Sequence, residues 1–133
     1  MSDNHTSEKA LLGLKMAQQY LGEKLLTALR KDTRSDLFTK TLEEYTAEVT
    51  LSSYARPGLS FRERNLMNIA MFVALNRPHE LRINLQSAVH NGLSKEQICE
   101  AIRHATLYCG MAAGRDAFLL ASEVFGVSKI EAN

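Results

Sequence analysis

Hydrophobic residues recur every three or four positions along most of the chain, which is the period of an amphipathic α-helix. In the N-terminal part this pattern predicts one helix over residues 8–29, with a break near Gly22, and a second over residues 35–51. Their apolar stripes consist of Leu11, Leu14, Leu21, Leu25 and Leu29 in the first, and of Leu37, Phe38, Leu42, Tyr45 and Val49 in the second. The faces over residues 37–49 and 66–73 could belong to the core or to an interface, and the sequence leaves both open.

Four more helices are predicted in the second half of the chain, over residues 61–75, 78–90, 95–109 and 112–125. Their boundaries carry residues typical of helix ends: Ser60 and Ser94 each begin a capping box, Pro78 suits a first helical position, and Asn91-Gly92 suits a C-terminal cap. The 61–75 helix is apolar nearly all round, so we expect it to be buried. The chain is therefore predicted to be all-α, a compact bundle of about six helices with short connections.

Length and composition fit one globular domain. The chain has 133 residues, of which 45% are hydrophobic and 23% are charged. Domains typically have about 100–150 residues, and disordered chains have fewer apolar residues and a larger net charge. We expect a single domain over residues 1–133, with flexible tails at about 1–8 and 127–133.

Charge and hydropathy argue against two kinds of partner. Sixteen Lys and Arg residues against fifteen Asp and Glu residues give a formal charge of +1, which leaves no basic excess for binding nucleic acid. The longest apolar run, over residues 69–75, is far shorter than the roughly 20 residues of a membrane-spanning helix. The first five residues are polar and do not suggest a secretory signal, so a cytoplasmic location is expected.

The two cysteines, Cys99 and Cys109, lie on the same predicted helix. Ten residues of helix separate them by about 15 Å, whereas a disulfide needs Cα atoms closer than about 7 Å. We therefore expect two small buried thiols and no intramolecular dithiol chemistry.

Polar residues on otherwise apolar helices are the candidates for chemistry. Glu80 lies in the first turn after Pro78, where the helix dipole favours a carboxylate. Asn84, one turn later, could hydrogen-bond to Glu80 or line a pocket. These two have the i, i+4 spacing of helical metal ligands, but Asn is a poor ligand, and no metal site is predicted. His104 lies in a helix that looks largely buried, where it could be a core histidine or a functional one.

Cations and an aromatic residue complete the candidate set. Arg62 and Arg64 open the 61–75 helix, and a helix N-terminus favours anions; a surface ion pair is the alternative for each. Tyr108 is a substrate-binding candidate; the alternative is that it packs, with its hydroxyl group bonded to a partner. The sequence contains no glycine-rich phosphate loop and no nucleophile elbow.

Several segments, in this order and spacing, resemble the carboxymuconolactone decarboxylase family, and within it the 4-carboxymuconolactone decarboxylases. These segments are Arg56–Arg64, Glu80-Leu81, Ala88–Ser94, Ile98–His104 and Tyr108–Gly110, preceded by Gly13, Leu21-Gly22 and Glu43–Tyr45. The resemblance implies an all-α subunit that assembles into homo-oligomers, hexamers among the closest relatives. It also implies a cofactor-free reaction in aromatic-compound (protocatechuate) breakdown, in which 4-carboxymuconolactone loses CO2 to give the β-ketoadipate enol-lactone.

This reaction suggests roles for the candidates. Arg62, Arg64 or Arg77 would bind the substrate carboxylate that is retained, because guanidinium groups bind carboxylates in a bidentate fork. His104 or Asn84 would stabilise the enolate oxygen. Glu80 or His104 would deliver the proton to carbon.

Two departures from the family pattern bear on these roles. The family usually has histidine where this chain has Asn84, and it tends to have proline where this chain has Met111-Ala112. Peroxidase-associated members of the superfamily have a CxxC pair at the positions of Arg77 and Glu80, so thiol-dependent peroxidase activity is disfavoured here. The alternatives left open are a decarboxylase or isomerase acting on another small acidic ring compound, and a catalytically silent oligomeric binding protein.

Overall fold

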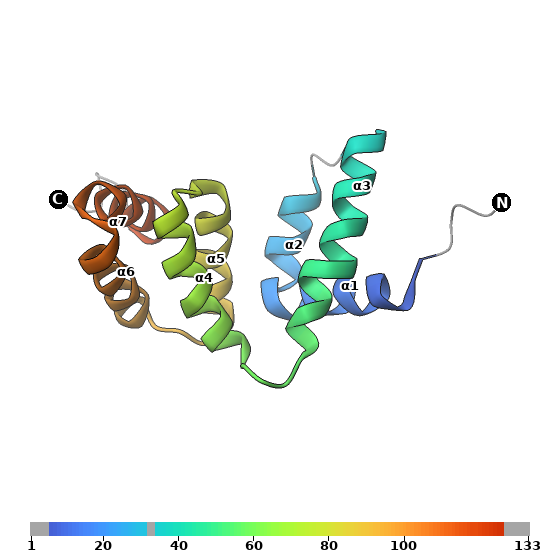
Figure 1. Cartoon of the computed structure of the whole chain (residues 1–133), viewed down its shortest axis with the longest axis horizontal. Coiled ribbons are helices and arrows are strands. Elements are labelled where there is room, and N and C mark those ends of the chain that lie inside the picture. The colour runs from blue at the N-terminus through green and yellow to red at the C-terminus, as the bar shows by residue number, and fades with distance from the viewer. Residues whose placement is uncertain (1–5, 32–33, 127–133) are drawn as a thin grey trace. The chain divides into compact units, whose positions relative to one another are not determined.

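The computed structural model describes residues 6–31 and 34–126 (Figure 1). These residues form seven α-helices and no strand, which confirms the all-α prediction. The helices are α1 (Glu8–Leu21), α2 (Glu23–Arg30), α3 (Leu37–Tyr45), α4 (Phe61–Leu75), α5 (Pro78–His90), α6 (Lys95–Cys109) and α7 (Met111–Phe125). A π-helical segment, η1 (Thr46–Leu51), and a 3₁₀ turn, η2 (Ser52–Ala55), continue α3. The count exceeds six because Gly22, at φ 84°, separates α1 from α2.

The chain divides into two compact units, one up to Phe61 and one from Arg62 onward. That both form a single domain remains a prediction. Tails were predicted at about residues 1–8 and 127–133. Residues 1–5 and 127–133 lie outside the described residues, and Glu8 already belongs to α1, with Ser7 as its N-terminal cap. In the part of the chain that the structure describes, no helix is long and apolar enough to cross a membrane.

In the first unit, α1 packs against η1 and η2. Gly13 allows the close approach, because a Cβ atom at this position would overlap the backbone of Ala47. Three rings close the end of the unit: Tyr20 lies 4.7 Å from Tyr54 and 5.4 Å from Phe61, measured between ring centroids. By contrast, α2 and α3 bury no residue.

In the second unit, α7 packs against both α5 and α6. The core consists of Ile69, Val73, Leu81, Leu85, Ala88, Leu93, Ile98, Ile102, Ala105 and Ala117. The predicted capping box at α6 is present: the Gln97 backbone N–H donates to Ser94 Oγ, and the Ser94 backbone N–H donates to Gln97 Oε1. Gly92, just after α5, and Gly110, just after α6, have positive φ angles of 92° and 94°, as helix-ending glycines do.

Two burial predictions are wrong. Both Cys99 and Cys109 are exposed, because the buried face of α6 is formed by Ile98, Ile102 and Ala105. The α4 helix is not buried all round either: it buries one face, while the large apolar side chains Met67, Met71 and Leu75 are exposed.

Candidate active site

A buried network of amide side chains joins α4 to α5. At its centre is Asn65 of α4, which is fully buried. Its Nδ2 donates to the backbone carbonyl of Asn84 at 3.2 Å and to Ser87 Oγ at 2.9 Å. Its Oδ1 accepts from Nδ2 of Asn91 at 2.7 Å. Buried polar groups are costly unless they are paired, so this network fixes how the two helices meet.

The side chain of Asn84 is held at both ends of its amide. Its Oδ1 accepts a 3.1 Å hydrogen bond from Asn68 Nδ2, and its Nδ2 donates at 2.9 Å to the backbone carbonyl of Glu80. Only 7% of Asn84 is exposed. The predicted contact between Asn84 and Glu80 therefore exists, but it is made to the backbone of Glu80. The amide of Asn84 is part of the core and links α4 to the first turn of α5.

Asn65, Asn68 and Ser87 were not among the residues singled out from the sequence. A signal was available, because each is a polar residue on the apolar face of a helix. Asn65 and Asn68 are spaced i, i+3 on α4, and Asn84 and Ser87 have the same spacing on α5. Residues at this spacing lie on one face of a helix. The sequence therefore indicated that each of the two helices has a pair of polar residues on one face.

Glu80 lies in the first turn of α5, and its side chain is exposed. Pro78 occupies the start of the helix, as predicted. The carboxylate is thus close to unpaired backbone N–H groups, which favour a negative charge. The anchored backbone carbonyl and the accessible carboxylate make Glu80 a group that can act on a bound molecule.

His104 and Tyr108 lie one turn apart on the exposed face of α6. Their ring centroids are 5.5 Å apart and the rings are tilted by 57°. Both burial predictions are therefore wrong: the helix buries Ile98, Ile102 and Ala105 instead, and 81% of Tyr108 is exposed. His104 is therefore accessible to a ligand.

The three candidate arginines lie at the start of α4 and α5. Arg62 is exposed and Arg64 half-buried in the first turn of α4, while exposed Arg77 is the N-terminal cap residue of α5. Arg77 and Asp116 line a cavity of about 20 Å³ between α4, α5 and α7, which has room for little more than a water molecule. This cavity is therefore too small for an organic substrate.

The structure thus groups the candidates by helix. Arg77, Glu80 and Asn84 occupy the first two turns of α5, and His104 and Tyr108 the last turns of α6. These helices follow one another through a short turn and contact each other. Glu80 lies ten residues before the end of α5 at His90. His104 lies nine residues after the start of α6 at Lys95. Within the described residues, no group of three or more His, Cys, Asp or Glu side chains is arranged to hold a metal ion.

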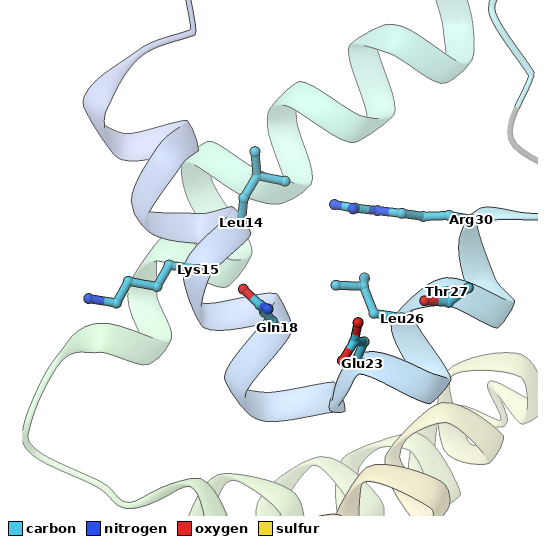
Figure 2. A pocket seen from close by; sticks show the side chains of 7 residues that line it. All are labelled: Leu14, Lys15, Gln18, Glu23, Leu26, Thr27 and Arg30. Atoms are coloured by element: carbon cyan, nitrogen blue, oxygen red, sulfur yellow. The ribbon is translucent and has the colours of Figure 1, made fainter.

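A larger hollow lies in the first unit, between α1 and α2 (Figure 2). It measures about 470 Å³ and is lined by Leu14, Lys15, Gln18, Glu23, Leu26, Thr27 and Arg30. Figure 2 shows the side chains of Leu14, Leu26 and Arg30 directed into one space, with Lys15 directed away from it. The sequence did not predict this hollow. None of the candidate residues lines it.

Fold and site together define an all-α protein with accessible acid–base groups on consecutive helices. Residues 38–123 match the sequence profile described as the carboxymuconolactone decarboxylase family. The chain is 32% identical over 114 residues to the 4-carboxymuconolactone decarboxylase of Acinetobacter baylyi, an alignment that covers 85% of this chain and 84% of the relative. The chain therefore belongs to the carboxymuconolactone decarboxylase family, as its motifs predicted.

A second relative is named for a different acid. The chain is 31% identical over 100 residues to the nitrosuccinic acid decarboxylase npaB of Metarhizium robertsii, covering 74% of this chain and 68% of the relative. Both relatives are named as decarboxylases, whereas the acids in their names differ.

Proposed function

We propose that this protein is a carboxy-lyase that converts 4-carboxymuconolactone to the β-ketoadipate enol-lactone and CO2. The observation that carries this proposal is the 32% identity to a 4-carboxymuconolactone decarboxylase over 85% of the chain. The accessible Glu80 and His104 on α5 and α6 support it, because they supply the acid–base groups that the reaction needs.

The substrate itself can accept the electrons of this reaction. As the C–C bond to the departing carboxylate breaks, its electron pair moves through the ring double bond onto the lactone carbonyl oxygen. The resulting enolate must then be protonated at carbon. The protein has to bind the retained carboxylate, stabilise the enolate oxygen and deliver that proton.

Exposure and hydrogen bonding in the second unit bear on the roles that we propose for these residues. Arg62, Arg64 and Arg77 remain the candidates for binding the retained carboxylate. Glu80 and His104 remain the candidates for the proton donor, since both are accessible. Asn84 becomes a positioning residue for the first turn of α5, because its amide already bonds to Asn68 and to the Glu80 carbonyl.

The second relative supports an alternative substrate of related chemistry. Nitrosuccinic acid, by its name, carries a nitro group that can accept the electrons released when CO2 departs. The common requirement would be a small anionic acid with its own electron acceptor. The 31% identity to the nitrosuccinic acid decarboxylase makes such an acid the second candidate.

The test is CO2 release from freshly prepared 4-carboxymuconolactone by the purified protein, with nitrosuccinic acid assayed in parallel. Glu80→Ala should lower the rate by roughly 10²-fold or more if Glu80 transfers the proton. Glu100→Ala, which removes another exposed carboxylate from the second unit, is the matched control and should keep the wild-type rate. Release no faster than the spontaneous rate, from folded protein and with both acids, would contradict the proposal and favour a catalytically silent binding protein.

A further inference from the structure

Glu80 lies where α5 has the least support of its own. The first N–H groups of a helix have no acceptor within it, and helix ends fray. Pro78, at the start of α5, has no backbone N–H to contribute. The first turn is closed by a 2.9 Å hydrogen bond from the Leu81 backbone N–H to the carbonyl oxygen of Arg77. A side chain in this turn keeps one position only if a group outside the turn holds it.

Two amide side chains connect this turn to α4. Asn68 Nδ2 donates to Asn84 Oδ1 at 3.1 Å, and Asn84 Nδ2 donates to the backbone carbonyl oxygen of Glu80 at 2.9 Å. Asn68 and Asn84 are only 9% and 7% exposed, so water competes little for these two hydrogen bonds. Glu80, by contrast, is exposed. The two bonds therefore lead from the core to the backbone of a residue whose side chain can reach a bound molecule.

The hydrogen-bonding capacity of each group fixes the direction of these two bonds. The carbonyl oxygen of Glu80 can only accept, so Asn84 has to present its Nδ2 to it. The Oδ1 atom of Asn84 then faces α4, and a buried oxygen is costly unless it accepts a hydrogen bond. Asn68 supplies a donor, which an apolar residue at position 68 could not do. The residue at position 68 therefore decides how firmly Asn84 keeps the orientation that holds Glu80.

Separate contacts hold the rest of α5. Asn65 Nδ2 donates to the backbone carbonyl of Asn84 and to Ser87 Oγ, and Leu85 is fully buried. None of these contacts involves the Asn68 side chain. Loss of the amide of Asn68 should therefore loosen the first turn of α5 and leave α5 attached to α4.

We propose that Asn68 is a positioning residue for Glu80. Acting through the amide of Asn84, it keeps the first turn of α5 in place and, with it, the carboxylate that transfers the proton. This inference rests on the proposed function, with Glu80 as the proton donor. A proton donor has to lie within hydrogen-bond reach of the atom that it protonates, and a misplacement of about 1 Å can lower a rate by about 10²-fold. Because other groups bind the retained carboxylate, the loss of Asn68 should lower kcat and leave KM close to its wild-type value.

Asn68→Leu tests this role, because it removes the donor with little change in side-chain size. It should lower kcat by about 10- to 10²-fold, with KM close to that of wild type. Ile69→Val is the matched control. It removes one carbon from a buried side chain on the same helix, breaks no hydrogen bond, and should keep the wild-type kcat. A wild-type kcat in Asn68→Leu, or an effect on KM alone, would overturn the inference.

Combining Asn68→Leu with Glu80→Ala tests whether Asn68 acts through Glu80. Once the carboxylate is absent, its position no longer matters, so Asn68→Leu should lower kcat no further. The same loss of kcat in the Glu80→Ala background as in the wild-type background would overturn the inference. Far-UV circular dichroism establishes that each variant is folded. Asn68→Ala, which also lacks the donor, takes the place of Asn68→Leu if the leucine variant does not fold.

Hydrogen exchange measures the hold on the first turn without any assay of activity. The backbone amides of residues 81–84 donate to carbonyl groups of residues 77–80 in an α-helix, so their exchange rates report opening of this turn. Exchange at these amides should be faster in Asn68→Leu than in wild type and in Ile69→Val. Unchanged exchange, in a protein that releases CO2, would overturn this inference alone. Absence of CO2 release by the wild type with both acids would instead contradict the proposed function.

Discussion

The side chain of Asn68 on α4 donates a 3.1 Å hydrogen bond to the side chain of Asn84 on α5. The Nδ2 atom of Asn84 in turn donates a 2.9 Å hydrogen bond to the backbone carbonyl oxygen of Glu80. Asn84 is therefore integrated into the core by an amide partner on the neighbouring helix. Glu80 is held through its backbone while its carboxylate stays accessible.

Removing this partner should destabilise the second unit. Asn68→Ala deprives the buried amide of Asn84 of a hydrogen bond, which should cost about 1–3 kcal/mol in the free energy of unfolding. Chemical denaturation measures this cost. Gln86→Ala removes an exposed amide from α5 and should change stability by no more than about 0.5 kcal/mol.

A double-mutant cycle separates the pair from its surroundings. Combining Asn68→Ala with Asn84→Ala should give a coupling free energy of about 0.5–3 kcal/mol, as expected for side chains in direct contact. Strict additivity of the two substitutions would show that the amide pair contributes nothing of its own.

Asn84→Asp should make stability depend on pH. When protonated, the introduced carboxyl can donate to the Glu80 carbonyl as the amide does; when ionised, it places a negative charge in the core. Burial beside that carbonyl raises the folded-state pKa of the carboxyl above its unfolded value of about 3.9. The folded state then binds more protons than the unfolded state, so stability relative to wild type should fall as pH rises above about 4.

Denaturation at pH 4 and at pH 7, with wild type measured beside the variant, tests this sign. The difference between the two proteins should be larger at pH 7. An equal difference at both pH values would mean that the introduced carboxyl is solvated in the folded state, in conflict with the burial of Asn84.

The helices could be predicted well because their ends are encoded locally. Ser94 with Gln97, Pro78 and Gly92 act through neighbouring backbone groups, and α4, α5 and α6 have the predicted bounds. Gly22 likewise ends α1 at the predicted break. The spacing of apolar residues, however, does not indicate which surface covers the apolar face of a helix. For this reason the sequence could not decide whether the apolar face over residues 37–49 belongs to a core.

The site was harder to predict because exposure depends on which face packs. Ile98, Ile102 and Ala105 define the buried face of α6, and His104 lies roughly 120° around the helix from it at 3.6 residues per turn. Counting apolar neighbours in sequence, without that angle, made His104 look buried. The bond between Asn84 and Asn68 joins residues 16 positions apart and could not be read from local sequence at all.

The contact between Gly13 and Ala47 gives a further prediction. A Cβ atom at residue 13 would overlap the backbone of η1, and backbone cannot move aside as a flexible side chain can. Gly13→Ala should therefore destabilise the first unit by about 1–3 kcal/mol, measured by thermal or chemical denaturation. Gly58→Ala is the matched control, because a Cβ atom there meets nothing within 4 Å. Equal stability of the two variants would contradict the close packing of α1 on η1.

His104 and Tyr108 can be separated by kinetics. If His104 donates the proton, His104→Gln should lower kcat by about 10²–10⁴-fold and change the shape of the pH–rate profile. Tyr108→Phe keeps the neighbouring ring, whose centroid is 5.5 Å from that of His104, and should leave kcat within a few-fold of wild type. The decisive comparison is the profile, because a substitution that only disturbed α6 would lower the rate without changing its pH dependence. If instead the shape of the pH–rate profile changes in Glu80→Gln and stays that of wild type in His104→Gln, Glu80 is the proton donor.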